Sequence, residues 1–150
     1  AIVSEEPFGL RQEREQLAFA LVRLGRPDRP VGLPGEGFLR GTLISTPALV
    51  ARQPALAERM VRTMQRALAW RRANGPAAVV ARLGLEGPAA GAFEAMLQQY
   101  PRQFSEDGRF SAAQMAETER FFRESVDDTP EARALRLDTL LVDRWAGRKP

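Results

Sequence analysis

Prolines precede most of the segments in which apolar residues recur at helical spacing, and their positions divide the sequence into a series of separate predicted helices. A proline fits the first turn of a helix, where its missing N–H is not needed, but it disrupts a helix interior. Apolar residues at helical spacing after each of these prolines predict a helix that begins there. Such starts occur at Pro47, Pro54, Pro76, Pro88 and Pro130.

The clearest predicted helix begins at Pro54 and ends at Asn74-Gly75. We interpret Met60 and Met64 within its apolar stripe as core residues, because methionine fills irregular gaps at helical spacing. Further helices are predicted from Pro76 to a cap at Gly84, from Pro88 through Leu97, after a capping box of Ser111 and Gln114, from Pro130, around Leu137 to Trp145, and over Leu10 to Leu24 before Gly25.

Only two runs are typical of strands, Ala1–Ser4 and Phe38–Ser45. An isolated pair of strands is marginally stable, so these two are expected to join strands from elsewhere. The first residue is not Met and no leader precedes it, which favours an internal start. The predicted fold is therefore a helix-rich α/β structure that needs the preceding half of the protein and is incompletely stable without it.

The composition removes several functional classes. The chain has no His and no Cys, which excludes Ser-His-Asp triads, cysteine nucleophiles and sites with thiolate or imidazole metal ligands. Its 22 Lys and Arg oppose 19 Asp and Glu, and the cations are spread along the chain without interleaved aromatic residues, so we predict no nucleic-acid partner. No apolar run has the roughly 18 residues of a membrane span. Glu106-Asp107-Gly108 lacks the further acids of a calcium loop, and no metal or cofactor is predicted.

Glu5-Glu6-Pro7-Phe8 is the segment most suggestive of a ligand site, because it lies where a predicted strand ends and a helix begins. In open α/β sheets, ligands bind beyond the carboxyl ends of strands and near helix N-termini. The two acids could therefore face a ligand. They could equally serve only to complement the dipole in the first turn of the helix.

The segment Ala1–Phe8 resembles the second hinge of periplasmic binding proteins of the nitrate, sulfonate and taurine family, which also includes binders of thiamine pyrimidine precursors. The resemblance covers essentially the whole chain and consists of short matches in the family's order. The other matching segments are Leu43–Pro47 with Arg52–Leu56, Ala67–Asn74, Asp107–Ser111 and Met115–Thr118.

The resemblance implies the C-terminal portion of a two-lobed periplasmic binding protein fold. Residues 1–37 would end the second lobe and form the hinge crossover, and residues 38–150 would supply a returning strand and the helices that complete the first lobe. Such a protein is not an enzyme. It captures a small polar solute between its lobes, delivers it to the membrane permease of an ABC transporter, and lies in the periplasm or is lipid-anchored outside the cytoplasmic membrane.

Four residues are candidates for the solute site implied by the resemblance. Glu6 would bind a ligand cation or donor, Phe8 would form a wall, and Arg40 and Thr42 would contact the solute from the returning strand. Two departures from the family pattern suggest a different ligand. Ser4-Glu5 stands where many relatives have an aromatic residue before the hinge acid, and Arg40-Gly41-Thr42 stands where they tend to carry small or aromatic residues. Arg40 could form a fork for an anionic group or be an ordinary exposed arginine.

Two other classes of function stay open. A relative of the same fold synthesises a thiamine pyrimidine, but the chemistry known in that family depends on His, which this chain lacks. A purely helical interaction module would need only the amphipathic stripe from Met60 to Leu68. That alternative leaves Glu5-Glu6-Pro7 unexplained.

Overall fold

The computed structural model describes residues 6–21, 39, 41–101, 104–125 and 129–149 of the chain, which has 150 residues in all. The described parts are helix-rich with a small parallel sheet, which agrees with the predicted helix-rich α/β class. In chain order the elements are α1 (Phe8–Arg14), α2 (Pro47–Arg52), α3 (Pro54–Arg82), α4 (Gly87–Gln99), β1 (Phe110–Ser111), α5 (Ala112–Ser125), α6 (Pro130–Arg133), a 3-10 helix η1 (Leu137–Thr139) and β2 (Arg148–Lys149).

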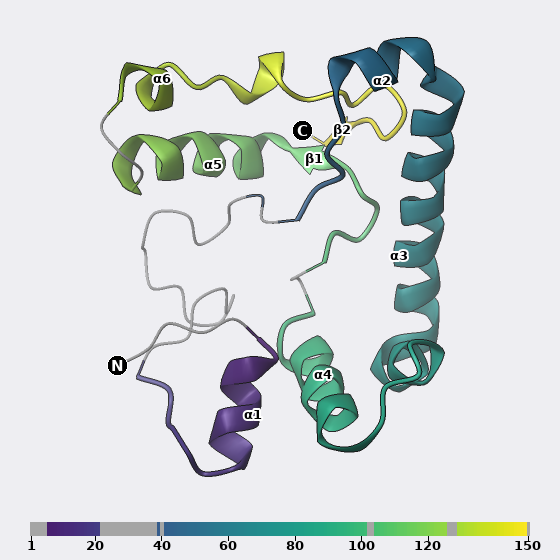
Figure 1. The fold of residues 1–150 in the computed structure, drawn as a ribbon, viewed down its shortest axis with the longest axis vertical. Helices are drawn as coiled ribbons and strands as arrows, with labels where there is room; N and C mark the ends of the chain where they lie inside the picture. Colours follow the sequence, from purple (N-terminus) through teal and green to yellow (C-terminus); the bar gives the residue numbers. More distant parts are fainter. Residues whose placement is uncertain (1–5, 22–38, 40, 102–103, 126–128, 150) are drawn as a thin grey trace.

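Helix α3 is the longest element and lies along one side of the molecule (Figure 1). It contains both helices predicted around Asn74-Gly75, because the chain kinks there instead of separating. Gly75 has φ 78° and ψ 176°, outside the helical region, and Pro76 starts the next turn. The predicted boundary at Asn74-Gly75 is thus confirmed as a kink, and Gly84 follows the helix with φ 65°, as expected for a C-terminal cap.

Hydrogen bonds from capping side chains start helices α2 and α5 at the positions that the sequence predicted. Thr46 Oγ1 accepts the Leu49 N–H at 3.2 Å ahead of α2. In the capping box before α5, Gln114 N–H donates to Ser111 Oγ at 3.1 Å, and Ser111 N–H donates to Gln114 Oε1 at 3.4 Å. These bonds satisfy N–H groups that a helix start otherwise leaves without partners.

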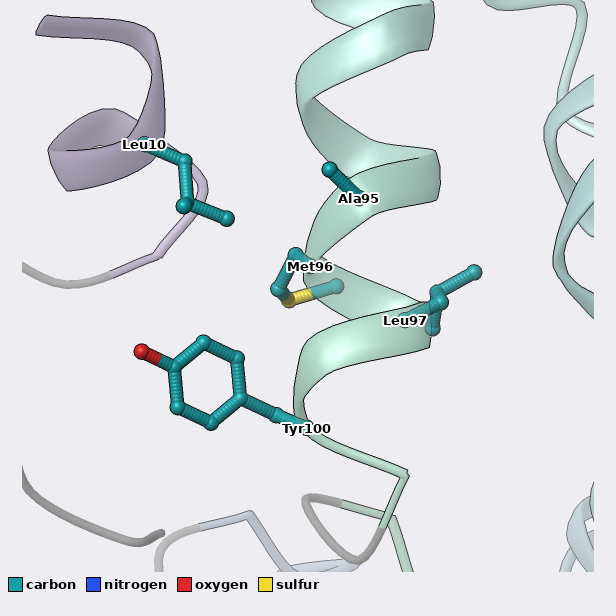
Figure 2. Close-up of a cluster of buried hydrophobic side chains, with 5 residues drawn as sticks. All are labelled: Leu10, Ala95, Met96, Leu97 and Tyr100. Atoms are coloured by element: carbon teal, nitrogen blue, oxygen red, sulfur yellow. The ribbon is translucent and has the colours of Figure 1, made fainter. Parts of the chain in front are cut away.

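The main buried cluster lies between α1 and α4. Figure 2 shows Leu10 of α1 directed toward α4, with Met96 and the Tyr100 ring facing it. Leu10 and Met96 are 4% and 2% exposed. Ala95 and Leu97 complete the cluster, and the partly buried side chains of Val79 in α3 and Phe93 in α4 pack against it. This packing positions the start of α1 beside the end of α4.

The predicted helix from Leu10 to Leu24 is wrong in extent, because α1 ends at Arg14. Gln16 has φ 57°, in the left-handed region, which ends the helix. Leu17 and Leu21 were expected on its apolar stripe, but they are 73% and 75% exposed. Only Leu10 of this stripe meets a packing surface in the described chain, so burial stabilises one helical turn and not the following ones.

The strand predicted over Phe38–Ser45 is also wrong for its described residues, 39 and 41–45, which form no strand. The Leu39 N–H donates to Thr118 Oγ1 of α5 at 2.9 Å. The acceptor of this N–H is therefore a side chain, whereas in a strand it would be the backbone of a neighbouring strand. The strands observed in the described chain are β1 and β2, paired in parallel with Phe110 opposite Arg148 and Ser111 opposite Lys149. The other predicted strand, Ala1–Ser4, lies outside the described residues.

Two helical predictions near the C-terminus are confirmed in part. Helix α6 begins at Pro130 as expected but is short, and the stretch from Leu137 to Trp145 contains only η1. Leu137 is 8% exposed, and its N–H donates to Glu119 Oε1 of α5 at 2.9 Å. The crossover predicted over Arg26 to Gly37 lies outside the described residues.

Candidate functional site

Glu6 lies at the N-terminal end of α1, where its partly buried carboxylate contacts two different elements. Its Oε2 accepts the Leu10 N–H at 2.9 Å, within the first turn of α1. Its Oε1 accepts the hydroxyl of Tyr100, at the end of α4, at 3.5 Å. Gly9 leaves room for this carboxylate, because a Cβ there would lie 3.3 Å from Oε2. An ionised carboxylate has about four acceptor positions, so it can accept further donors besides these two.

Of the other predicted site residues, Phe8 is the one that lies near this carboxylate in the described chain. Phe8, the first residue of α1, follows Glu6 closely in the chain and is 65% exposed. Thr42 is exposed in the segment that leads into α2, which lies at the opposite end of the molecule from α1 (Figure 1). Arg40 lies outside the described residues. The structure therefore places Glu6 and Phe8 on one corner and does not bring Thr42 to them.

A shallow groove with a volume of about 330 Å³ lies at the other end of the α1–α4 contact. Gly91 permits a close approach there, since a Cβ on it would lie 3.0 Å from Arg14 Nη1. Arg11 Nε donates to Glu15 Oε1 at 2.8 Å, and this hydrogen bond raises the pKa of Arg11 above its ordinary value. The lining residues are Arg11, Arg14, Glu15, Gly87, Pro88, Gly91 and Ala92.

Glu6 and Arg14, at the far end of the groove, lie too far apart to bind the same small solute. Helices α1 and α4 run antiparallel, because Glu6 meets Tyr100 at the end of α4 while Arg14 meets Gly91 near its beginning. Glu6 and Arg14 are eight positions apart, which corresponds to roughly 12 Å along a helix at about 1.5 Å per residue. A molecule the size of taurine is shorter than that separation, so it could not contact Glu6 and Arg14 at the same time.

Asp107, dismissed as a calcium ligand on sequence grounds, forms a polar link between three parts of the fold. Its Oδ1 accepts the Arg109 N–H at 3.1 Å, and its Oδ2 lies 3.1 Å from Lys149 Nζ of β2. Its backbone carbonyl accepts Gln65 Nε2 of α3 at 3.1 Å. Burial acts to raise the pKa of Asp107, but the Arg109 N–H and the Lys149 ammonium outweigh it, and the net pKa is lowered.

The lowered pKa of Asp107 predicts a small, pH-dependent contribution to stability. Because the ordinary pKa of this carboxyl is 3.8, the contribution is present above that pH and is lost as the pH falls through the lower folded value. We expect Asp107→Asn to reduce the free energy of unfolding at pH 6 by no more than about 1 kcal/mol, because its ion pairs are exposed.

Urea unfolding of wild type and Asp107→Asn from pH 2 to pH 7 measures this difference. The gap between the two proteins should close below about pH 4. Lys149→Gln should lose part of the same pH-dependent contribution, since Lys149 supplies one of the charges. A gap that is equal at pH 2 and pH 6 would show that the carboxylate charge is not involved.

Comparison with protein-family models, with curated proteins and with solved structures finds no match for this chain. Within the described residues, no three or more His, Cys, Asp and Glu side chains gather in a way that could hold a metal ion. In the same parts of the chain, no helix is both long and apolar enough to cross a membrane.

Sequence reasoning identified Glu6 but missed the residues that position it. Tyr100 is the only tyrosine of the chain, yet it is 94 positions from Glu6, and no local pattern relates the two. Gly9 carried a weak signal, since a glycine inside the first turn of a predicted helix indicates that another group approaches closely. Arg11 and Arg14 share one side of α1, but no local sequence pattern indicates that Gly87, Pro88 and Gly91 lie beside them.

Proposed function

We propose that this chain is the C-terminal part of a solute-binding protein of an ABC importer, with a donor group of the solute bound at Glu6. The Glu6 carboxylate carries the proposal. It is partly buried, oriented by both α1 and α4, and still able to accept hydrogen bonds. A few oriented polar groups beside apolar walls are typical of small-molecule sites, and Phe8 offers such a wall.

The exposed apolar side chains near Glu6 support the proposal that another part of the protein packs against this end of the chain. Phe8, Leu17, Phe19 and Leu21 are between 65% and 81% exposed, although they follow one another within a short segment. Large apolar side chains that are exposed to this extent are candidates for contact with a partner surface. The preceding half of the protein is the partner that the proposed two-lobed fold implies, and no catalytic residue is assigned.

The chemistry of Glu6 selects among the solutes of the proposed family. A carboxylate accepts hydrogen bonds and favours a cation, so it suits the ammonium of taurine or the amino group of a thiamine-type pyrimidine. Nitrate and simple sulfonates carry no N–H donor and would face this acid unfavourably. We therefore propose an amine-bearing or aminopyrimidine solute.

Thermal shift and calorimetric titration of the two-lobed polypeptide test this proposal with matched solutes. Taurine and an aminopyrimidine of the thiamine-precursor type are compared with ethanesulfonate, which is taurine without its amine, and with nitrate. We expect one amine-bearing solute to stabilise the protein by about 2.7 kcal/mol at a concentration 100 times its Kd. Binding of none of the four, or equal binding of taurine and ethanesulfonate, would count against the assigned role of Glu6.

A further inference from the structure

The first half of α3 presents an exposed apolar stripe that the proposed solute site does not use. Met60 and Met64 are 49% and 45% exposed, and Trp70 is 41% exposed. Together with exposed Ala67, they recur every three or four residues, which places them along one strip of the helix surface. The prediction that Met60 and Met64 belong to the core is therefore wrong, and we call these four residues the α3 stripe.

One side of the α3 stripe is strongly basic. Helix α3 contains six arginines and one glutamate, a net charge of +5 from 6 − 1, whereas the whole chain carries +3. Arg59, Arg62 and Arg66 follow the stripe along one edge, which we call the basic edge. Glu58 lies 3.6 Å from Arg62, and both side chains are exposed, so the acid offsets one of the three charges in part.

The other side of the α3 stripe is occupied by the chain itself. Gln65 Nε2 donates to the Asp107 carbonyl at 3.1 Å, and Arg72 Nη1 donates to the Glu106 carbonyl at 3.3 Å. The exposed strip is therefore about one helix wide, with a basic edge on one side and the 104–108 loop on the other. Figure 1 shows α3 along the outer side of the molecule.

We propose that the α3 stripe docks an amphipathic, acidic helix of a protein partner. Such a helix would place its apolar side chains on Met60 and Met64 and its carboxylates against the basic edge. Methionine suits this role because its flexible thioether adapts to varied apolar side chains, and helix-on-helix docking uses anchors at the same three-and-four spacing. Charge complementarity defines the partner as acidic.

The same features favour a protein helix over two other occupants. A second copy packed antiparallel on this face would bring the two basic edges to the same side, where like charges repel. An anionic membrane would need a broad apolar face, yet the strip is narrow and the carboxylates of Glu106 and Asp107 belong to the loop beside it. The experiment below would detect binding of either alternative occupant.

The test uses a synthetic helix-forming peptide of about 18 residues, with leucines at helical spacing on one face and glutamates beside them. Fluorescence anisotropy measures its binding to the full chain. A peptide with the same composition in scrambled order, phosphatidylglycerol vesicles and a short DNA duplex are titrated in parallel. We expect the ordered peptide to bind at least about tenfold more tightly than the scrambled one, and raised salt to weaken it.

Two matched pairs of double variants locate the binding surface. Met60→Gln with Met64→Gln should weaken peptide binding at least about tenfold, whereas Leu83→Gln with Leu140→Gln, at exposed leucines elsewhere, should leave it unchanged. Arg59→Gln with Arg66→Gln should weaken binding about fivefold and flatten its salt dependence. Arg123→Gln with Arg136→Gln removes equal charge in α5 and ahead of η1, away from the stripe, and should have little effect.

Hydrogen exchange on the wild-type chain gives a readout that needs no variant. The ordered peptide should increase protection of amides between residues 56 and 72. Preferential binding of vesicles or DNA, peptide-independent dimers in sedimentation, absence of peptide binding, or equal loss in the control variants would each overturn the proposal. These results do not depend on Glu6 or on a solute, so failure here is distinguishable from failure of the proposed solute site.

Discussion

Leu97→Ala is expected to lower the free energy of unfolding by about 2–5 kcal/mol, the usual cost of removing a buried leucine side chain. Leu97 is 4% exposed and belongs to the buried cluster of α4. Figure 2 shows the Leu97 side chain on the side of α4 away from Leu10, and the close-packed neighbours around the remaining cavity would relax into it only in part. Because domains are stable by only about 5–15 kcal/mol, this one change removes a large share of the total.

Leu83→Ala provides the matched control for this prediction. The chemical change is identical, but Leu83 is 57% exposed just beyond the end of α3, so we expect a loss below about 1 kcal/mol. Urea unfolding followed by circular dichroism compares the two midpoints. Equal losses in the two variants would mean that the α1–α4 cluster is not the main core of the protein.

Glu6→Gln is expected to weaken solute binding more than tenfold while changing stability by less than about 1 kcal/mol. Removing the charge from a desolvated charged hydrogen bond typically costs roughly 2–5 kcal/mol of binding free energy, and about 1.4 kcal/mol corresponds to tenfold in Kd. The amide oxygen of glutamine can still accept the Leu10 N–H, and its NH2 group can donate to the Tyr100 hydroxyl oxygen, so the main loss is the weak attraction between the carboxylate and the helix dipole.

Calorimetric titration and a thermal melt of the two-lobed polypeptide separate these effects. Glu15→Gln is the control, since Glu15 lies at the other end of α1 and pairs with Arg11 on the surface. We expect no change in solute affinity for this control. Unchanged affinity together with a lowered melting temperature in Glu6→Gln would reduce Glu6 to a helix-capping acid, the alternative that its sequence position also allowed.

The sequence by itself determined where most helices begin and where several end, because those boundaries depend on neighbouring residues. Thr46 accepts an N–H three residues later, Ser111 and Gln114 exchange bonds within one turn, and Gly75 and Gly84 adopt backbone angles that other residues rarely reach. Each of these signals lies within four positions of its effect. Capping and turn chemistry of this range can be predicted without knowing the fold.

Only the tertiary structure decided which apolar residues are buried. The stripe of Leu10, Leu17 and Leu21 and that of Met60 and Met64 satisfy the same periodicity as a buried helix, yet only Leu10 meets a packing surface. The same holds for the strands, because a run of β-branched residues forms a ladder only where another strand lies beside it, and Phe110–Ser111 has such a neighbour in Arg148–Lys149.

The surroundings of Glu6 depended on tertiary structure in the same way. Its position before a helix could be predicted, but the Tyr100 hydroxyl reaches it only because Leu10 packs on Met96 and places α1 antiparallel to α4. The spacing of apolar residues in the sequence indicates which side of a helix or strand is apolar. Which surface covers that side is decided by contacts between residues far apart in the chain, because burial lowers the free energy only where two surfaces meet.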